Sequence, residues 1–525
     1  MCLIGCKKSH YSLKKLLFFL LSPSLVFAQD GAFRYFISFT DKVNTDYSIN
    51  TPEQYLSVRT IVKRQKYGIP VDSTDLPITV EYINELKTQG FVIENKSRWF
   101  NGLVVSTFDS LLIQTLNQNF IDTIISFGSW QNTKDISKKW QLNYNVSDYG
   151  NSYNQLQMLG GDVMHSKGFL GNGIIIAVID AGFYKVNELD VFADLQNQIL
   201  DTYDFVDGNT NVYDDHTHGM MVLSTMGAKQ SGKMIGTAPE ANYLLLRSED
   251  VFSENLIEEY MWVCAAEYAD SVGADIINSS LAYTTFDDYA QNHTYADMNG
   301  KTAPISIGAG IACDKGMIVV NSAGNSGNSN WYYIGAPADH ADVLTVGAVD
   351  ENKKFASFSS YGPNAEGFTK PNVVAQGKNT VVANSSNEVM TGNGTSFSSP
   401  VTAGMIACLW GSNSCRTPND IKDAIYKSAD RYLKPDDQFG YGIPNYYNAY
   451  QLLNSVINLS QGIPINTLIE YKVYTIDGKE MNNGKTILYN ENSTLSFIKP
   501  KTAGVYIIHL FTDSFELNKR FIVLE

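Results

Sequence analysis

The chain contains the stretch Gly394-Thr395-Ser396-Phe397-Ser398-Ser399-Pro400, followed by Val401-Thr402-Ala403-Gly404-Met405-Ile406-Ala407. It predicts a loop that turns directly into a helix, because Pro400 lacks the N–H that has no partner in a first helical turn. A serine at this turn lies near free backbone N–H groups and the positive end of the helix dipole. That position suits a nucleophile whose attack creates an oxyanion. Helix-capping serines are commoner than catalytic ones, so the serine needs partners elsewhere in the chain.

The region from about residue 150 to about residue 456 alternates between apolar strands and helices. Continuous apolar strands of this kind are typical of sheets buried on both faces. They predict an α/β fold, doubly wound, in which a mostly parallel sheet carries helices on both faces. In such a sheet, ligands bind beyond the carboxyl ends of the strands. The predicted strands are 173–179, 243–246, 274–277, 317–320 and 343–348, with a helix at 256–269.

Polar side chains follow these strands. Asp180 comes directly after the first strand, Asn325 lies shortly after the fourth, and His218 begins a helix-like run. The order along the chain is therefore Asp, His, Ser. An α/β-hydrolase esterase has the order Ser, Asp, His, and here no histidine follows the serine stretch until His509. A dinucleotide site is excluded because the glycines near residue 170 precede the strand and do not follow it.

Over roughly residues 150 to 456 the chain resembles the subtilisin-like serine proteases. Several motifs in the same order carry this resemblance, which makes coincidence a poor explanation. The serine motif is Gly394-Thr395-Ser396-x-Ser398-x-Pro400, the aspartate motif Ile179-Asp180-Ala181-Gly182, the histidine motif His218-Gly219-x-x-Val222, and the asparagine motif Ser322-Ala323-Gly324-Asn325; Gly236-Thr237-Ala238-Pro239 and Gly440-Tyr441-Gly442 resemble further landmarks.

The resemblance implies a secreted serine endopeptidase that cleaves protein or peptide substrates through an acyl-enzyme. Ser396 would be the nucleophile, His218 the general base and Asp180 the residue that orients it. The Asn325 amide and the Ser396 backbone N–H would hold the oxyanion. The implied substrate-binding backbone is Ser280, Leu281, Ala282, Ala323 and Gly324.

Two residues differ from the family pattern, and a third is a second candidate for the general base. Met220 stands two places after His218, where the family usually has threonine, and Ala282 stands where it usually has glycine. His216 competes as the base, but the spacing to Gly219 and Val222 favours His218, and His216 is expected in a surface loop. A catalytically silent, secreted binding module is the alternative function, and Met220 is its support.

The flanking segments predict an exported precursor. Residues 1–29 carry lysines, a short apolar run and a small residue near their end, as a secretory signal peptide does. Residues 30–135 read as a small α+β unit, which the resemblance implies is a propeptide that blocks the cleft; a permanent binding domain is the alternative. Residues 465–525 read as a β-sandwich that resembles the sorting domain of type IX secretion, with an ordinary accessory module as the alternative. The catalytic domain itself is placed at 150–456, and the protein is expected to be secreted or at the cell surface.

Composition limits the partners and cofactors. The net charge of −15 comes without a basic stripe, which excludes nucleic acid as an expected partner. No cysteine and histidine pattern predicts zinc, and calcium, which many relatives bind, is left open because no ligand spacing stands out. Cys264, Cys313, Cys408 and Cys415 remain after signal removal. A Cys408–Cys415 disulfide is the expected pairing, and buried reduced thiols are the alternative.

Overall fold

The computed structural model describes residues 32–109, 111–116, 119–129 and 149–455, and in the C-terminal region 457–458, 468–475, 478–487, 494–495, 504–512 and 515–523. The predicted signal peptide and nearly all of the polar linker at 131–149 lie outside these residues. In the described part of the chain, no helix has both the length and the apolar character needed to cross a membrane.

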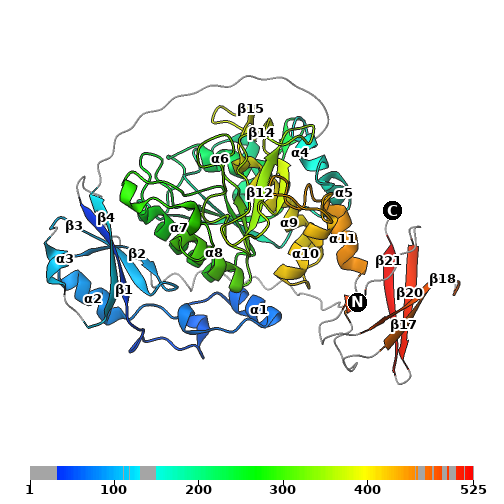
Figure 1. Ribbon diagram of the computed structural model, residues 1–525, viewed down its shortest axis with the longest axis horizontal. Coiled ribbons are helices and arrows are strands. Elements are labelled where there is room, and N and C mark those ends of the chain that lie inside the picture. The colour runs from blue at the N-terminus through cyan, green and yellow to red at the C-terminus, as the bar shows by residue number, and fades with distance from the viewer. Residues whose placement is uncertain are drawn as a thin grey trace.

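The central sheet has seven strands in the order β13-β12-β11-β10-β5-β9-β6, and all neighbouring strands are parallel (Figure 1). Helices cover both of its faces, so the predicted fold class is confirmed. The strands are β5 (Ile175–Asp180), β6 (Ile199–Asp204), β9 (Asn242–Arg247), β10 (Ile276–Ser279), β11 (Ile318–Ser322), β12 (Leu344–Val349) and β13 (Val373–Gln376).

Strand β5 shows why continuous apolar runs predicted this fold. Its side chains alternate between two cores: Ile176 and Val178 pack in one, and Ala177 and Ile179 in the other. Both faces of the strand are therefore dry, and each residue needs an apolar side chain. The first core includes α6 (His218–Gly227), α9 (Thr395–Ser412), α10 (Pro418–Ser428) and α11 (Tyr446–Ser455), and the second includes α7 (Ile257–Val272) and α8 (Pro304–Asp314).

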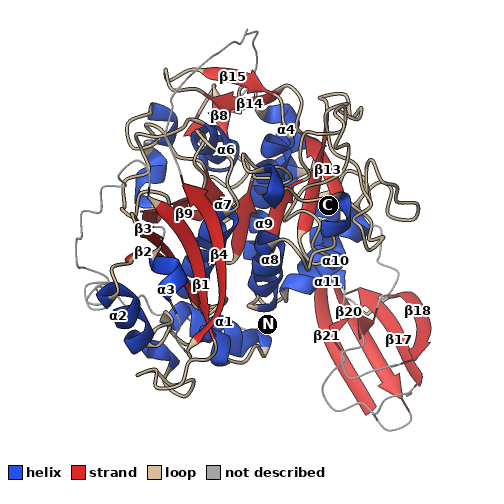
Figure 2. Cartoon of the chain, turned by 60° about the vertical axis from the view of Figure 1, so that its left-hand side comes forward, coloured by secondary structure: helices blue, strands red, loops and turns tan. Residues whose placement is uncertain are grey.

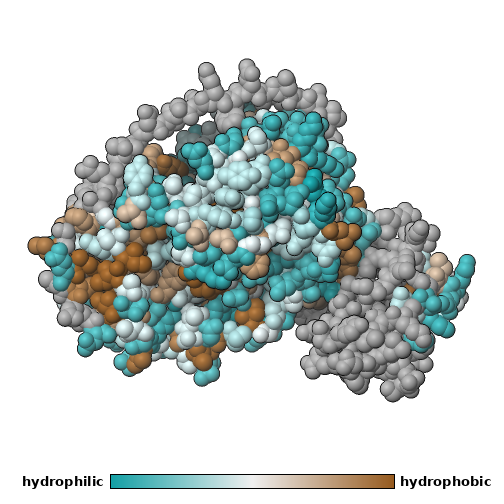
Figure 3. All heavy atoms as spheres, viewed as in Figure 1, coloured by the Kyte–Doolittle hydropathy of each residue, from teal (hydrophilic) through white to brown (hydrophobic). Residues whose placement is uncertain are grey.

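The N-terminal unit is a small antiparallel sheet with helices, in the strand order β2-β3-β1-β4 (Figure 2). This arrangement confirms the small α+β unit that the sequence predicted. Large apolar side chains are exposed over this unit, as the brown atoms of Figure 3 show on its visible face. Its elements are β1 (Phe33–Phe39), α1 (Val58–Tyr67), α2 (Val80–Thr88), β2 (Val92–Ser97), β3 (Gly102–Thr107), α3 (Leu112–Thr115) and β4 (Ile121–Ser129).

Helix α1 contacts the larger domain through buried ion pairs. Val58 and Val62 are 74% and 55% exposed, while Arg64 is buried. The Arg64 guanidinium donates to Asp75 of its own unit and to Asp270 of α7, at 2.7 Å each. An amphipathic reading of the sequence directs the valines inward, and the structure directs them outward because the buried partners of this helix are carboxylates.

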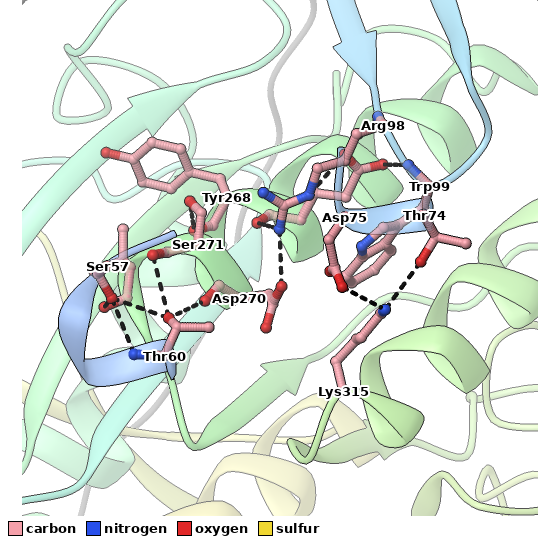
Figure 4. Close-up of polar contacts among 12 residues, drawn as sticks. Ser57, Thr60, Thr74, Asp75, Arg98, Trp99, Tyr268, Asp270, Ser271 and Lys315 are labelled. Carbon is pink, nitrogen blue, oxygen red and sulfur yellow. Dashed lines mark hydrogen bonds and ion pairs between the residues drawn. The ribbon is translucent and has the colours of Figure 1, made fainter. Parts of the chain in front are cut away.

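Other ionic groups extend this contact, which Figure 4 shows in close-up. Arg98 lies 2.8 Å from Asp270, and Lys315 lies 3.1 Å from Asp75. Glu267 of α7 accepts hydrogen bonds from the Ser97 hydroxyl and from the backbone N–H of Arg98. The N-terminal unit is thus joined to α7 by a buried network of alternating charges.

The C-terminal region contains a four-stranded antiparallel sheet in the order β18-β17-β20-β21 and a short pair, β16 with β19. Much of the predicted β-sandwich lies outside the described residues, including Asp477 of the expected Asp477-Gly478 turn. The strands are β16 (Ile457–Asn458), β17 (Leu468–Thr475), β18 (Glu480–Ile487), β19 (Thr494–Leu495), β20 (Gly504–Thr512) and β21 (Phe515–Val523).

The predicted Cys408–Cys415 disulfide is wrong. Both thiols are free, as are those of Cys264 and Cys313. Cys408 lies inside α9, where it is buried and its Sγ donates to the carbonyl oxygen of Thr237 at 3.1 Å. Cys415 lies beyond the end of the helix and is exposed, so the two side chains occupy different environments.

Candidate active site

A cavity of about 290 Å³ opens at the carboxyl ends of β5, β10 and β11 and at the N-termini of α6 and α9. It brings together most of the residues that the sequence placed at the site. Asp180 lies behind this lining and is fully buried, and Ala323 is buried in a small apolar group with Ile334 and Ala338. The lining includes His218, Ser280, Leu281, Ala282, Gly324, Asn325 and Ser396.

Asp180 and His218 form a pair. Asp180 is the last residue of β5, and its Oδ1 lies 2.7 Å from Nδ1 of His218, the first residue of α6. The close approach of this helix requires Gly219, since a Cβ there would lie 2.4 Å from the carbonyl oxygen of Gly182. A carboxylate at Nδ1 fixes the proton on that nitrogen and leaves Nε2 as the acceptor.

The charges around His218 favour its protonated form. Burial acts against a charged imidazole, but the Asp180 carboxylate outweighs it and raises the pKa of His218 to about 9. Asp180 Oδ2 is itself buried without a hydrogen-bond partner among the described residues. The negative charge of Asp180 is therefore committed to the imidazole, which is the arrangement that stabilises an imidazolium formed during a reaction.

Ser396 lies in the first turn of α9, one residue into the helix and not before it. Its side chain lines the same cavity as His218. The hydroxyl donates to the carbonyl oxygen of Ser280 at 3.4 Å, and among the described residues no hydrogen bond joins it to His218. Hydrogen bonds between catalytic groups are often long in a ligand-free enzyme and shorten when substrate binds.

The amide of Asn325 is oriented by Thr395. Asn325 Oδ1 accepts from the Thr395 backbone N–H at 2.9 Å and from its hydroxyl at 3.0 Å. A backbone N–H only donates, so the oxygen of the amide must face Thr395 and the NH₂ group faces away. Because Asn325 lines the cavity beside Ser396, this NH₂ is a donor available to an oxygen bound there.

Two further side chains hold β10 and α9 together beneath the cavity. Ser399 of α9 donates to Asn278 Oδ1 at 3.0 Å, and the Ser280 hydroxyl donates to the carbonyl oxygen of Ser396 at 3.0 Å. These bonds fix the position of Ser396 relative to β10 and to the residues after it that line the cavity. Ser399 belongs to the serine motif of the sequence. Its hydrogen bond to β10, which supports the site, is visible only in the folded structure.

His216 and Met220 occupy different places. His216 is exposed, as expected for a loop, but it also lines the cavity, with its ring centroid 6.4 Å from that of His218. Its Nδ1 accepts from the His218 backbone N–H at 3.3 Å, while only His218 contacts Asp180. Met220 is fully buried in the core that includes α6 and does not line the cavity.

Sequence reasoning missed the acidic residues of the cavity. Glu249 and Glu254 line it, in the segment between β9 and α7. The rule that ligands bind beyond strand ends also applies to β9, which ends at Arg247, and so pointed to Glu249. The segment carries no recognisable motif, so Glu249 and Glu254 were not predicted as site residues.

Among the described residues, one acidic group has the spacing of a metal site, and it already holds a cation. Asp204, Asp207 and Asp215 could place one oxygen each around an ion. Arg247 Nη1 lies between them, at 2.7, 3.0 and 3.3 Å from the three carboxylates. The guanidinium already occupies the space between these oxygens, so the three residues do not fit calcium.

Comparison with known proteins gives two family matches. The model of the Subtilase family matches residues 171–442. The model described as the Peptidase S8 propeptide domain, Bacteroidota, matches residues 34–142. The first match includes every cavity residue named above, and the second covers the N-terminal unit.

Named relatives are proteases. Serine protease AprX of Bacillus subtilis (strain 168) is 29% identical over 332 residues, which are 58% of this chain and 69% of that protein. The Thermophilic serine proteinase of Bacillus sp. (strain AK1) is 32% identical over 283 residues, 53% of this chain and 62% of that protein. Subtilisin E of Bacillus subtilis (strain 168) is 28% identical over 301 residues, 56% of this chain and 70% of that protein.

Proposed function

Because the chain belongs to the subtilase family of serine proteases, we propose that it is a secreted serine endopeptidase with Asp180, His218 and Ser396 as its catalytic residues. The observation that carries this proposal is the Asp180–His218 pair at 2.7 Å in contact with a cavity that Ser396 and Asn325 also line. Activity on a casein-type substrate, compared with that of Ser396→Ala, tests it.

The proposed reaction follows from these positions. Ser396 Oγ attacks the carbonyl carbon of the peptide bond while His218 Nε2 takes its proton, because a serine hydroxyl is too weak an acid to react alone. Asp180 holds the ring and stabilises its charge. The proton then passes to the leaving amine, and water releases the acyl group by the same steps in reverse.

Asn325 is proposed to hold the oxyanion with its NH₂ group, together with the backbone N–H of Ser396. Replacing Asn325 with alanine removes a donor that acts on the transition state more than on the substrate. We expect kcat to fall about 100- to 1,000-fold with little change in KM. Steady-state kinetics on a peptide substrate measures both. A variant whose KM rises while kcat stays unchanged would contradict this role.

The pH dependence of activity follows from His218. The base must be neutral to accept the serine proton, and the Asp180 carboxylate raises the pKa of His218 to about 9. The neutral fraction therefore grows as the pH rises. We expect kcat/KM for an uncharged peptide to rise from pH 7 through pH 9 and to level off only above about pH 10. A plateau already reached at pH 7 would show that Asp180 does not hold the imidazole in its charged form in solution.

The N-terminal unit, placed at 30–135, is proposed to be an inhibitory propeptide that the protease removes by cleavage before the domain at 150–456. The family match at 34–142 and the buried ionic contact with α7 support this role. A permanent binding domain is the alternative, and N-terminal sequencing of the secreted product separates the two. A mature chain that still begins near residue 30 would favour the permanent domain.

Export is proposed to use the signal peptide at 1–29 and a C-terminal sorting domain of the type IX kind at 465–525. The antiparallel strands β17 to β21 and the sequence resemblance support the second part. Deleting residues 465–525 tests it: the protease should stay inside the cell envelope. Normal release of the shortened chain would favour an accessory module.

A further inference from the structure

One end of the active-site cavity is acidic. Glu249 and Glu254 line it, and Glu258 is fully buried in the first turn of α7. Burial, and then the negative charges of Asp287 and Glu259, raise the pKa of Glu254 to about 7. Burial, and then the negative charges of Asp180 and Glu254, raise the pKa of Glu249 to about 8. Burial and the charges of Glu249 and Glu254 also raise the pKa of Glu258.

These three carboxylates have no close cationic partner. Within the described part of the chain, no lysine, arginine or histidine lies within ion-pair distance of Glu249, Glu254 or Glu258, although the charge of the more distant His218 acts on Glu249. Two other buried acids of the domain do have such partners: Asp204 pairs with Arg247 at 2.7 Å, and Glu259, next to Glu258 in α7, pairs with His293 at 2.6 Å. This end of the cavity lacks the ion pairs that balance those two acids.

Two polar atoms beside them also lack partners. Tyr283 lines the cavity, is only 1% exposed, and its hydroxyl has no hydrogen-bond partner among the described residues. Glu258 Oε2 is buried and unpartnered in the same way. Burial, and then the charges of Glu258 and Glu249, raise the pKa of the Tyr283 hydroxyl, so these groups share one environment. Buried polar groups are costly without partners, and a bound donor would satisfy them.

We propose, on the premise of the protease function above, that this acidic end binds the side chain of a lysine or arginine in the substrate, close to the bond that is cleaved. An ammonium or guanidinium group brings several N–H donors and a positive charge to the acceptors of Glu249 and Glu254. Its apolar stem matches the Val251 and Leu281 side of the lining. The site thus selects polypeptides with a basic residue next to the reacting carbonyl.

The chain itself carries a segment of matching charge, which follows strand β4 in the sequence. Gln291 Nε2 donates to the carbonyl oxygen of Ser126 in β4 at 3.3 Å, and the Asp287 backbone N–H donates to the Glu254 carbonyl oxygen at 2.8 Å. Strand β4 therefore ends beside the loop that borders the acidic residues. The sequence that follows β4 contains Lys134, Lys138 and Lys139 before the catalytic domain begins. A preference for basic residues fits cleavage within this segment.

Peptides that differ at one position test the proposal. Each peptide of the set contains one bond that is cleaved and carries either lysine or glutamine at one chosen position near that bond. The peptides are assayed with the mature protein, produced from the full-length precursor. We expect kcat/KM to favour lysine about 10- to 100-fold at one position, the range for a hydrogen bond to a charged group. In Glu249→Gln/Glu254→Gln the lysine-to-glutamine ratio should fall towards one. The control Glu366→Gln, at an exposed carboxylate paired with Lys301, should keep the wild-type ratio.

The outcomes separate the two proposals. Wild-type protein that cleaves these peptides with a ratio near one at every position overturns the basic subsite and leaves the protease function standing. Wild-type protein as inert as Ser396→Ala overturns the protease function itself. If millimolar Ca²⁺ raises the melting temperature of the wild type but not of Glu249→Gln/Glu254→Gln, and no lysine preference exists, the carboxylates bind a metal ion and the substrate proposal is wrong.

The wild type alone provides a second test, which does not depend on the folding of a variant. Glu254 and Glu249 ionise as the pH rises, with pKa values of about 7 and about 8, while a substrate lysine stays charged. The lysine-to-glutamine ratio should therefore increase between pH 6 and pH 9. The charged groups that face Glu249 and Glu254 are Asp180, His218, Asp250, Glu258, Glu259 and Asp287. Titration of His218 as the general base acts on both peptides and cancels in the ratio. A ratio that is flat or falls over this range overturns the proposal.

Discussion

Replacing Ser396 with alanine is expected to lower kcat by roughly 10⁶-fold, the loss measured in subtilisin when the serine of the triad is removed. The variant keeps the fold, since the side chain makes one weak hydrogen bond, to the Ser280 carbonyl oxygen at 3.4 Å. Removing the nucleophile leaves only the oxyanion donors and substrate binding, which together give about 10³- to 10⁴-fold acceleration over water. Hydrolysis of a peptide substrate by purified protein measures the loss.

The same variant should accumulate uncleaved precursor if the protease removes its own N-terminal unit. Gel mobility and mass spectrometry of the secreted protein show which form is present. Equal processing of wild type and Ser396→Ala would mean that another protease cleaves the precursor. Equal and substantial activity of the two would mean that Ser396 is not the nucleophile. If both are equally inert, the silent binding module is the better explanation.

The neighbouring histidines provide a matched control for this result. His218 contacts Asp180 at 2.7 Å, and His216 lines the cavity without that contact. His218→Ala should therefore be as inactive as Ser396→Ala, whereas His216→Ala should keep most of its activity. The reverse outcome would move the base to His216 and contradict the position of the Asp180 carboxylate.

The central fold could be predicted because a strand that is buried on both faces is a continuous run of apolar residues in the sequence. Strand β5 sends alternate side chains into two cores, so it is apolar throughout and recognisable without its neighbours. The polar residues at strand ends then stand out, and Asp180 and Asn325 were found in this way. Glu249 obeys the same rule but belongs to no motif, and its importance depends on neighbours distant in the chain.

Contacts between units could not be predicted in the same way. The apolar positions of α1 suggested which face is buried, but Val58 is exposed and Arg64 is buried. The deciding partners, Asp75 and Asp270, lie 11 and 206 residues away along the chain. The spacing of apolar residues indicates which face of a helix is usually buried. A specific buried ion pair can bury the opposite face instead.

Arg64 is the residue whose loss should most weaken the contact between the N-terminal unit and α7. It is 1% exposed and bonds to Asp75 and Asp270, both of which are fully buried. Removing Arg64 takes one of two cations from each of these carboxylates, and the loss of one partner from a buried pair costs about 3–5 kcal/mol. We expect Arg64→Met, made in the Ser396→Ala chain to prevent processing, to lower the free energy of opening of the N-terminal unit by that amount.

Amide hydrogen exchange followed by mass spectrometry measures this free energy in α1 and β3, because exchange of protected amides reports local opening. Lys427→Met is the control, since Lys427 and Asp423 form an exposed pair within α10 and such pairs contribute at most about 1 kcal/mol. Protection of α1 should be unchanged in that control.

A combined variant separates charge from packing at this contact. In Arg64→Met/Asp75→Asn/Asp270→Asn no charge remains on these three residues, so the penalty for an unpaired buried carboxylate disappears. Part of the lost protection should return, although Arg98 and Lys315 then lose partners of their own, at 2.8 Å and 3.1 Å. If Arg64→Met changes protection by less than about 1 kcal/mol, the value typical of exposed pairs, the network does not hold the unit. A unit held by this network stays docked until the chain is cut, and its release then requires Asp270 to separate from both Arg64 and Arg98.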